Sequence, residues 1–206
     1  MRELKKFVNS FEWYQSFDLP NFKVKGRFPT HFDLKNPSVM PQDLKGKTWL
    51  DVACNTGLFC IEAARRGAKR VVGIEPDKTW LKRAKKLASF LGLGKIEYYP
   101  LSALEIGKLG SFDFVSCFSL IHLNEVRQPF QILQELKKAT KEVFITEVHT
   151  WELKFKINRF PWRVVLRHPL VTTRGVARIL KKDIGWKEVE YLGKSAKNRD
   201  LFRCLK

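Results

Sequence analysis

A run of small and polar residues follows an apolar stretch and has the composition of a ligand-binding turn. Residues 50–57 read LDVACNTG. Small residues let the backbone turn tightly, and a helix that begins after the turn offers free N–H groups to a ligand. The spacing is that of D-x-G-x-G-x-G, with Asp51 first, Gly57 last, and Ala53 and Asn55 at the first two glycine positions. Alanine costs little there and asparagine tolerates a positive φ. The run predicts a ligand site, with a purely structural strand–turn–helix connection as the alternative.

An acidic residue ends the next apolar run. Glu75 closes residues 70–75 and follows Asp51 by 24 positions. A carboxylate at this point can accept hydrogen bonds from both hydroxyls of a ribose. NAD would suit the same acid, but its pyrophosphate must approach the turn, where the Asn55 side chain would obstruct it. S-adenosylmethionine has no phosphates and carries an ammonium that Asp51 would attract. The two acids therefore favour S-adenosylmethionine over a dinucleotide.

The elements that must position these residues alternate between strands and amphipathic helices. Apolar runs of strand length occupy residues 48–53, 70–75, 96–99, 112–118 and 142–147. Helical spacing of apolar residues occupies residues 58–66, 79–91, 129–139 and 172–183, the last opened by Thr172 or Thr173 as N-cap. Residues 186–191 and 201–205 read as a closing hairpin. This order predicts an α/β, Rossmann-like fold: a seven-stranded, mostly parallel sheet with a C-terminal antiparallel hairpin and helices on both faces.

The stretch that contains the fourth and fifth predicted strands carries a resemblance to a known family. Residues 110–123 read GSFDFVSCFSLIHL, and residues 126–147 read VRQPFQILQELKKATKEVFITE. Together with the turn at Asp51, they resemble class I methyltransferases over residues 43–147. More narrowly, the chain resembles the tRNA wobble-uridine methyltransferases and carboxymethyltransferases. That narrower likeness rests on WYQSFDLP at 13–20, DLKGK at 43–47, and Asn55 within the turn.

The resemblance implies S-adenosylmethionine as cofactor and S-adenosylhomocysteine as its product. From the methionine part to the methyl group, the implied contacts are Asp51, Ala53, Asn55 and Gly57, the ribose acid Glu75, Pro76 and Asp77 beside the adenosine, then Phe118 and Ser119. In the family, an acidic residue usually follows the third strand, here residues 96–99, and contacts the adenine. This chain lacks that acid; Ser102 and Ala103 stand near its place and would contact the adenine instead. A carboxylated donor stays open; it would need a cation over the methyl group, and the sequence does not place one.

His122 follows the fourth predicted strand and has two interpretations. As a general base it would take a proton from a hydroxyl nucleophile, since its ordinary pKa is near 6.5. As a structural residue it would hydrogen-bond within its loop. We favour the structural role, because methyl transfer from a sulfonium draws much of its rate from positioning. His31 and His149 flank the same edge and are interpreted as incidental.

Positive charge dominates the composition. Lysine and arginine number 39 against 21 acids, for a formal net charge of +18. Such a surplus favours a nucleic-acid partner first and an anionic membrane surface second, with a merely solvated surface as the alternative. In residues 151–206, 15 basic residues stand against 5 acids. Basic and aromatic side chains that would contact phosphates and stack on bases are Lys154, Lys156, Arg159, Trp162, Arg163 and Arg167.

Two segments lie outside the strand–helix alternation and define the expected domain organisation. Residues 1–47 are expected to form an N-terminal helix, within 4–17, followed by an irregular extension over the active-site edge. Residues 48–206 are expected to form the methyltransferase domain, with 148–171 as a basic, aromatic insertion that covers the substrate. Alternatively, this insertion is a hydrophobic lid or rests on anionic lipid.

Compartment and metal content follow from the remaining composition. Four widely spaced cysteines without a CxxC pair predict reduced core thiols and neither a disulfide framework nor a metal site. Residues 1–6 do not resemble a signal peptide, and no apolar run approaches the ~20 residues of a membrane span. We therefore expect a cytoplasmic protein without a transmembrane segment.

These observations lead to one functional hypothesis with two alternatives. We expect an S-adenosylmethionine-dependent methyltransferase that acts on RNA, with tRNA first. One alternative is a methyltransferase for a small molecule or a lipid. The other is a protein that keeps this fold and binds nucleic acid without catalysis, because two motif glycines and the strand-three acid are missing.

Overall fold

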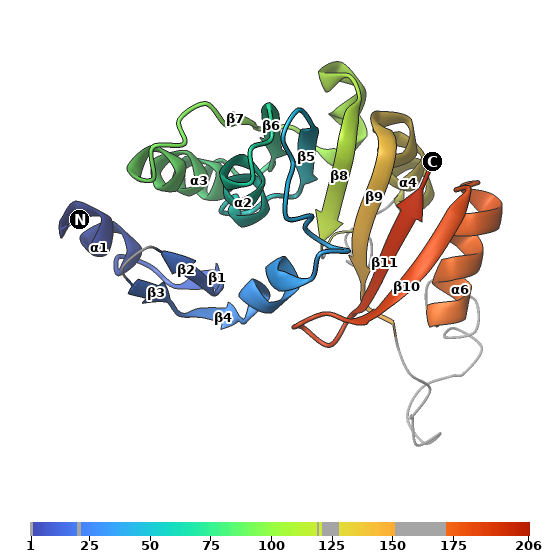
Figure 1. The fold of residues 1–206 in the computed structure, drawn as a ribbon, viewed down its shortest axis with the longest axis horizontal. Coiled ribbons are helices and arrows are strands. Elements are labelled where there is room, and N and C mark those ends of the chain that lie inside the picture. The colour runs from blue at the N-terminus through green and yellow to red at the C-terminus, as the bar shows by residue number, and fades with distance from the viewer. Residues whose placement is uncertain (1, 20–21, 119, 121–127, 151–171) are drawn as a thin grey trace.

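A seven-stranded sheet forms the centre of the molecule (Figure 1). The computed structural model describes residues 2–19, 22–118, 120, 128–150 and 172–206. The strands of the sheet are β5 (Thr48–Val52), β6 (Arg70–Ile74), β7 (Glu97–Tyr99), β8 (Phe112–Phe118), β9 (Thr140–Val148), β10 (Glu188–Lys194) and β11 (Asp200–Leu205). Their order is β10-β11-β9-β8-β5-β6-β7. Strands β5 to β9 pair in parallel, whereas β11 is antiparallel to both β9 and β10. The predicted sheet and closing hairpin are confirmed.

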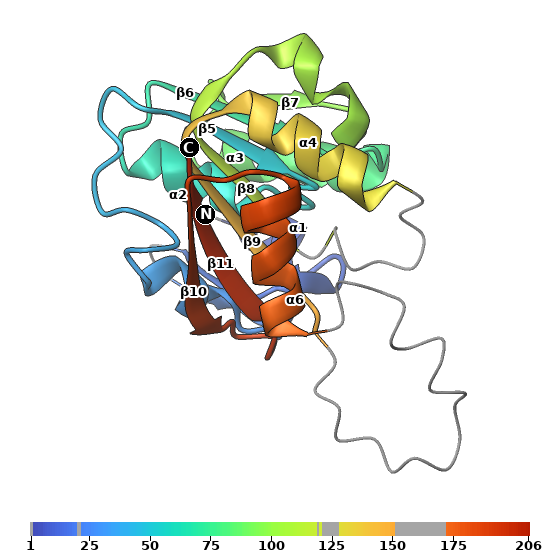
Figure 2. The same cartoon turned by 90° about the vertical axis from the view of Figure 1, so that its right-hand side faces the viewer.

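Helices cover both faces of the sheet, because its central strands alternate buried apolar side chains between two cores. Trp49 belongs to one core with α1 (Arg2–Val8), α2 (Leu58–Arg65) and α3 (Lys78–Phe90). Leu50 belongs to the other, with the 3₁₀ helix η2 (Ala103–Leu109), α4 (Pro129–Ala139) and α6 (Thr173–Arg178). Figure 2 shows α4 and α6 of this second layer. Parallel strands buried on both faces read as continuous apolar runs, which is the pattern seen in the sequence.

The N-terminal segment differs from the helix expected within 4–17. Helix α1 ends at Val8, and the indole N–H of Trp13 donates to the Val8 carbonyl at 2.7 Å. Short strands follow: β1 (Trp13–Gln15), β2 (Phe17–Leu19), β3 (Phe22–Val24) and β4 (Gly26–Phe28), then the 3₁₀ helix η1 (Thr30–Lys35). From Trp13 to Leu19 every second side chain is buried, which is the period of a strand. The helix prediction is therefore wrong beyond Val8, because burial there has a period of two.

Arg66 ties the connection between this segment and β5 to the domain. Its guanidinium donates to the carbonyls of Leu34, Met40 and Pro41, and it also pairs with Glu62 at 2.8 Å. Backbone carbonyls outside helices and strands need such donors when they are buried. The connection is thus anchored beside α2.

The C-terminal part follows the predicted order with two local differences. Thr172 accepts a hydrogen bond from the Gly175 N–H, so it is the N-cap of α6. The helix expected over 172–183 changes to a π-helical turn, η3 (Ile179–Asp183), after Arg178. The hairpin strands are longer than predicted and are joined by a turn at residues 195–199.

The remaining composition-based expectations bear on the core and on membranes. Cys54, Cys60, Cys117 and Cys204 are all buried free thiols, as expected of core residues. Within the described ranges, no three His, Cys, Asp or Glu side chains converge on a point that would hold a metal ion. No helix in the described part of the chain has the length and apolarity to cross a membrane.

Candidate functional site

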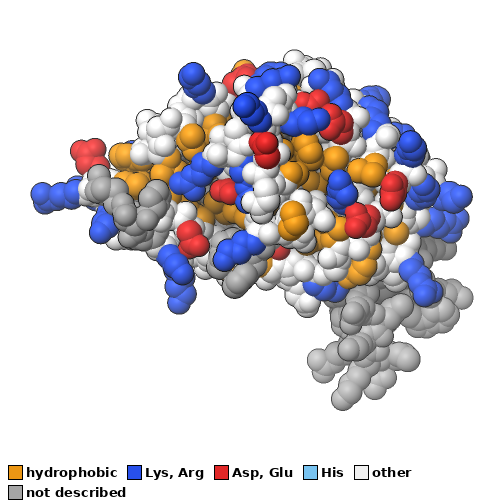
Figure 3. Space-filling view, in the orientation of Figure 1, with side chains coloured by type: hydrophobic (Ala, Val, Ile, Leu, Met, Phe, Trp, Pro, Cys, Tyr) orange, Lys and Arg blue, Asp and Glu red, His pale blue; other side chains and the backbone are white. Residues whose placement is uncertain are grey.

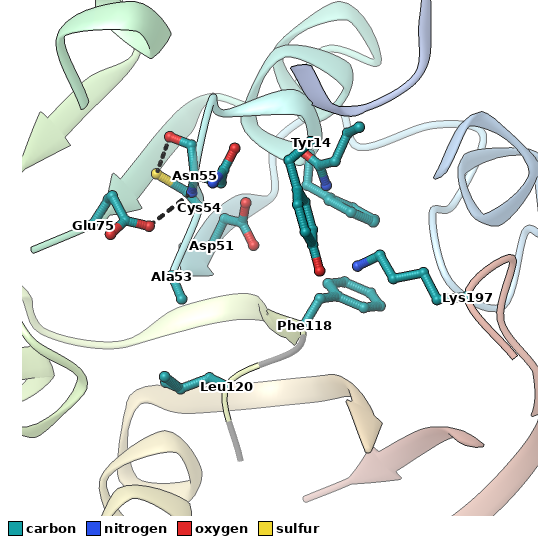
Figure 4. A pocket seen from close by; sticks show the side chains of 11 residues that line it. Tyr14, Asp51, Ala53, Cys54, Asn55, Glu75, Phe118, Leu120 and Lys197 are labelled. Atoms are coloured by element: carbon teal, nitrogen blue, oxygen red, sulfur yellow. Dashed lines mark hydrogen bonds between the residues drawn. The ribbon is translucent and has the colours of Figure 1, made fainter. Parts of the chain in front are cut away.

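A cavity of about 220 Å³ opens where β5, β6 and β8 end, beside β1 (Figure 4). In open α/β sheets, ligands bind outside the carboxyl ends of the strands. The side chains that line this cavity come from five parts of the chain and are Tyr14, Gln15, Asp51, Ala53, Cys54, Asn55, Phe59, Glu75, Phe118, Leu120 and Lys197.

The turn after β5 has the left-handed backbone conformation that favours glycine at three positions, although only one of the three residues is glycine. Ala53, Asn55 and Gly57 have φ values of 59°, 51° and 74°. The Asn55 side-chain oxygen accepts from the Thr56 N–H at 2.9 Å, which supports the turn. A Cβ at Gly57 would lie 2.3 Å from the Tyr98 hydroxyl, so only glycine fits. The turn brings backbone close to the cavity, as the motif spacing predicts.

Glu75 holds its carboxylate against this turn. It accepts from the backbone N–H groups of Asn55 and Asp77, both at 3.1 Å, and it is 9% exposed. Burial raises the pKa of this carboxyl, and the two backbone hydrogen bonds oppose the rise. A carboxylate oxygen has more than one lone pair, so each can still accept from a ligand hydroxyl. Glu75 is a fixed acceptor at one end of the cavity.

Asp51 also lines the cavity and is 2% exposed. The Ser116 hydroxyl donates to its Oδ1 at 2.7 Å, and the Trp49 indole N–H donates to that hydroxyl at 3.1 Å. Burial raises the pKa of Asp51 to about 7, while the Ser116 hydrogen bond opposes the rise. A cationic ligand group would favour the ionised form.

Gln15 brings a polar atom from β1 into the same cavity. Its side chain is buried, and its Oε1 has no hydrogen-bond partner among the described residues. A buried carbonyl oxygen without a donor costs free energy unless a ligand or water supplies one. Gln15 therefore marks a place where a ligand donor would bind.

Aromatic side chains form much of the opposite wall. Phe59 of α2 and Phe118 of β8 stack with ring centroids 4.3 Å apart. In Figure 4 the Tyr14 hydroxyl points toward Phe118, and the Lys197 amine points toward Tyr14. The cavity thus has an acidic side at Asp51 and Glu75 and an aromatic side that carries one cation.

The structure brings together five of the residues that the sequence singled out for the cofactor. These residues line the cavity and are Asp51, Ala53, Asn55, Glu75 and Phe118. Gly57 shapes the turn without lining it. In the sequence, these residues share a position at or near the end of an apolar run of strand length.

Other predicted cofactor contacts lie outside the cavity lining. Pro76 follows Glu75, and Asp77 caps α3 by accepting from the N–H groups of Thr79 and Trp80. Ser102 forms a capping box with Glu105 at the start of η2, which Ala103 begins. The Asp77 and Ser102 side chains thus have local structural roles.

Several predicted residues lie outside the described part of the chain. They are Ser119, His122, Lys154, Lys156, Arg159, Trp162, Arg163 and Arg167. The roles assigned to them stay predictions. His149 is described and exposed.

Sequence reasoning did not identify six of the lining residues. They are Tyr14, Gln15, Cys54, Phe59, Leu120 and Lys197. Tyr14 and Gln15 belong to the WYQSFDLP segment that carries the narrower resemblance, which was a usable signal. Lys197 comes from the C-terminal hairpin turn, and no local pattern links it to Asp51.

Comparison with known proteins agrees with the fold and with the turn. Residues 50–142 match the family model described as a methyltransferase domain. The chain is 34% identical over 117 residues to a tRNA U34 carboxymethyltransferase of Cellvibrio japonicus, covering 53% of this chain and 34% of that protein. It is 30% identical over 110 residues to a ubiquinone biosynthesis O-methyltransferase of Neisseria meningitidis, covering 52% and 46%. The chain thus spans less than half the length of either relative.

A solved structure shares the fold over nearly the whole chain. The N-terminal domain of EvdMO1, crystallised with S-adenosylhomocysteine bound, superposes with a TM-score of 0.68 at 16% identity. The match covers 99% of this chain and 93% of that domain. At this identity the match supports the architecture alone.

Proposed function

We propose that this chain, which belongs by fold to the class I S-adenosylmethionine-dependent methyltransferases, binds that cofactor in the cavity at Asp51 and transfers its methyl group. The observation that carries this proposal is the turn after β5. It keeps three positive φ values beside Glu75, although only one of the three residues is glycine. Strained non-glycine backbone persists where the surrounding structure enforces it and is frequent at ligand sites.

The hydrogen-bond acceptors of the cavity fit S-adenosylmethionine. Asp51 and the unsatisfied Oε1 of Gln15 offer acceptors for an ammonium. Glu75 offers a fixed carboxylate for a ribose diol. These residues would hold the cofactor, which supplies a methyl group activated on a sulfonium. Phe59 and Phe118 would exclude water from the cavity, and the chain's own part is therefore binding, orientation and desolvation.

For the acceptor, we propose RNA, with tRNA first. The support is a relative named for tRNA U34 and the net charge of +18. Lys and Arg side chains are spread over the face shown in Figure 3, which would suit a polyanion. A small-molecule acceptor is the second candidate, supported by a relative named for ubiquinone biosynthesis and by the aromatic wall of the cavity.

Calorimetric titration with S-adenosylhomocysteine tests the cofactor proposal. We expect Glu75→Gln and Asp51→Ala to weaken binding by roughly 10- to 100-fold, because each removes a charged hydrogen-bonding partner. Glu142→Gln is the matched control, since Glu142 is exposed and pairs with Lys47 far from the cavity. Wild-type protein without measurable binding would contradict the proposal.

Label transfer tests the acceptor. Methyl-tritiated S-adenosylmethionine is incubated with the protein and a cell extract, which is then separated into RNA, lipid and small molecules. Label in RNA that Asp51→Ala abolishes would support the RNA acceptor. Label confined to the small-molecule or lipid fraction would overturn it.

A further inference from the structure

Helices α1 and α3 lie side by side and form a strongly basic surface at one end of the molecule (Figure 1). Their sequences, RELKKFV and KTWLKRAKKLASF, contain eight basic residues and a single acid, Glu3. The basic residues of this α1–α3 surface are Arg2, Lys5, Lys6, Lys78, Lys82, Arg83, Lys85 and Lys86. All are exposed except Arg83, which is half-buried. None of them lines the cavity, so the function proposed above does not account for this surface.

Helix α3 carries its charge at a cost to its own stability. Lys78, Lys82 and Lys86 follow one another at intervals of four residues, so their side chains are neighbours on one side of the helix. Like charges at this spacing destabilise a helix, and α3 contains no acidic residue to offset them. The fold does not need this arrangement, and an anionic partner would relieve the repulsion.

Aromatic side chains form the floor of the α1–α3 surface. Phe7 of α1 and Phe90 of α3 have ring centroids 5.5 Å apart and are half-buried. Phe11, which follows α1, and Trp80 of α3 are half-buried as well. Figure 3 shows hydrophobic side chains intermixed with Lys and Arg at this end of the molecule. The surface is therefore basic and apolar at the same time.

Two cations of α3 lie over these rings. The Cζ atom of Arg83 lies 3.9 Å from the centroid of the Phe11 ring and 4.5 Å from that of Trp80. The Nζ of Lys86 lies 5.0 Å from the centroid of the Phe7 ring. Such cation–π contacts hold the charged groups at the ring faces. Three of the four rings thus have a face occupied by a cation of the chain itself.

This combination fits a layer of lipid headgroups better than a nucleic-acid strand. Single-stranded nucleic acid binds aromatic side chains by stacking its bases on open ring faces. Here cations already lie over the rings. At a membrane interface, by contrast, Lys and Arg lay their aliphatic stems along apolar surface and keep their charge at the headgroups. Aromatic side chains beside them enter the boundary of the acyl region.

We propose that the α1–α3 surface docks on an anionic membrane surface. Its lysines and arginines would lie at the lipid phosphates, with Trp80 and Phe11 at the boundary of the acyl region. Clusters of basic residues are attracted by the negative surface potential of such a bilayer, and the resulting attachment is peripheral and reversible. The inference is independent of the methyl acceptor, because this surface lies outside the cavity.

Co-sedimentation with lipid vesicles tests the electrostatic part. We expect wild-type protein to bind vesicles of equal parts phosphatidylglycerol and phosphatidylcholine, to release them as salt rises, and not to bind phosphatidylcholine alone. The double variant Lys82→Glu and Lys85→Glu should weaken binding by roughly 30-fold or more, because each lysine near the surface contributes roughly fivefold. Lys181→Glu with Lys182→Glu, the same charge change on η3 at the opposite end of the molecule, is the matched control and should bind as wild type (Figure 1).

Tryptophan fluorescence tests the apolar part. Vesicles whose acyl chains carry bromine quench a tryptophan that reaches the acyl boundary, so binding should quench part of the wild-type emission. Trp80→Phe keeps a ring beneath Arg83 and should bind with little loss, but less of its emission should be quenched. Trp186→Phe removes a tryptophan of the core, which is 1% exposed, and is the matched control that should keep the quenching.

Four results would overturn the inference. The first is wild-type protein that binds neither kind of vesicle, or both equally. The second is vesicle binding that Lys82→Glu with Lys85→Glu leaves unchanged, and the third is quenching that Trp80→Phe leaves unchanged. The fourth is a charge variant that loses affinity for tRNA and keeps its affinity for vesicles, which would assign the surface to nucleic acid.

Loss of the fold would not explain the expected result. Lys82→Glu places an acid one helical turn from Lys78 and from Lys86, which should stabilise α3. Thermal unfolding of each variant checks this. If the charge reversal is nevertheless unstable, Lys82→Gln with Lys85→Gln removes the same two cations and should still weaken vesicle binding by roughly 30-fold.

Discussion

Ala53 has a left-handed backbone conformation, which costs free energy for any residue that carries a Cβ. Its φ of 59° lies in the left-handed region, at a position where the motif would place glycine. The left-handed conformation costs roughly 1–2 kcal/mol for a residue with a Cβ. Glycine avoids this cost but loses about 0.5–1 kcal/mol of conformational entropy on folding.

We therefore expect Ala53→Gly to raise the free energy of unfolding by about 0.5–1 kcal/mol. Urea denaturation measures the change. Ala64→Gly within α2 is the control, and it should lower stability by about the same amount because glycine is a poor helix former. A loss of stability in Ala53→Gly would show that the turn is not strained at this residue.

The pH dependence of cofactor affinity should report the ionisation of Asp51. Its pKa is raised to about 7, so the carboxylate is ionised above that pH and protonated below it. A ligand ammonium prefers the ionised form, and affinity for S-adenosylmethionine should fall by up to about tenfold per pH unit below the pKa. Calorimetry across this range measures the profile.

Two variants separate Asp51 from other titrating groups. Ser116→Ala removes the hydrogen bond that lowers the pKa of Asp51 and should move the profile to higher pH. Asp51→Asn should bind weakly with a flat profile. If Asp51→Asn keeps the wild-type slope, another group such as Glu75 or Asp33 causes the dependence.

At the scale of elements, Arg66 holds the N-terminal segment to the domain. Its donors satisfy three backbone carbonyls of residues 34–41. We expect Arg66→Ala to lower the free energy of unfolding by about 2–4 kcal/mol, because it leaves partly buried carbonyls unpaired. Urea denaturation measures the loss. Arg65→Ala, which changes an exposed neighbouring residue, is the control and should lower the free energy of unfolding by under about 0.5 kcal/mol. Equal effects of the two variants would contradict the anchoring role.

The elements also show where sequence reasoning succeeds and where it stops. The strands that position Asp51 and Glu75 were predictable because their apolar runs have the length of a buried strand and are followed by turn residues. The strand at 13–15 was missed because the polar Gln15 occupies a buried position and hides the period of two. Lys197 was out of reach, since the contact between its turn and η1 joins residues 163 positions apart. No local pattern encodes such a contact.

At the scale of the whole molecule, the question is whether the excess charge binds a polyanion. One described feature suits a phosphate backbone: a surface hollow lined by Arg178, Lys181 and Lys182 of α6 and η3, with Glu188 at its side. These basic residues follow one another at helical spacing, so one face could track a nucleic-acid strand. A surface of solvated lysines that binds no polyanion would have the same composition. A measurement of binding is therefore needed to distinguish the two cases.

Affinity for tRNA as a function of salt distinguishes the two cases. Each phosphate contact releases a condensed counterion, so 6–10 contacts would lower affinity by about 10³–10⁵ between 50 and 200 mM salt. We expect wild-type protein to show a salt dependence of this order. The double variant Lys181→Glu and Lys182→Glu should make the dependence of affinity on salt shallower, by the equivalent of about one to two phosphate contacts. Lys5→Glu with Lys6→Glu, at the far end of the molecule on α1, is the matched charge control (Figure 1). A shallow slope in wild-type protein would mean that the charge is only solvated. That result would favour the second candidate, a small-molecule acceptor, over RNA.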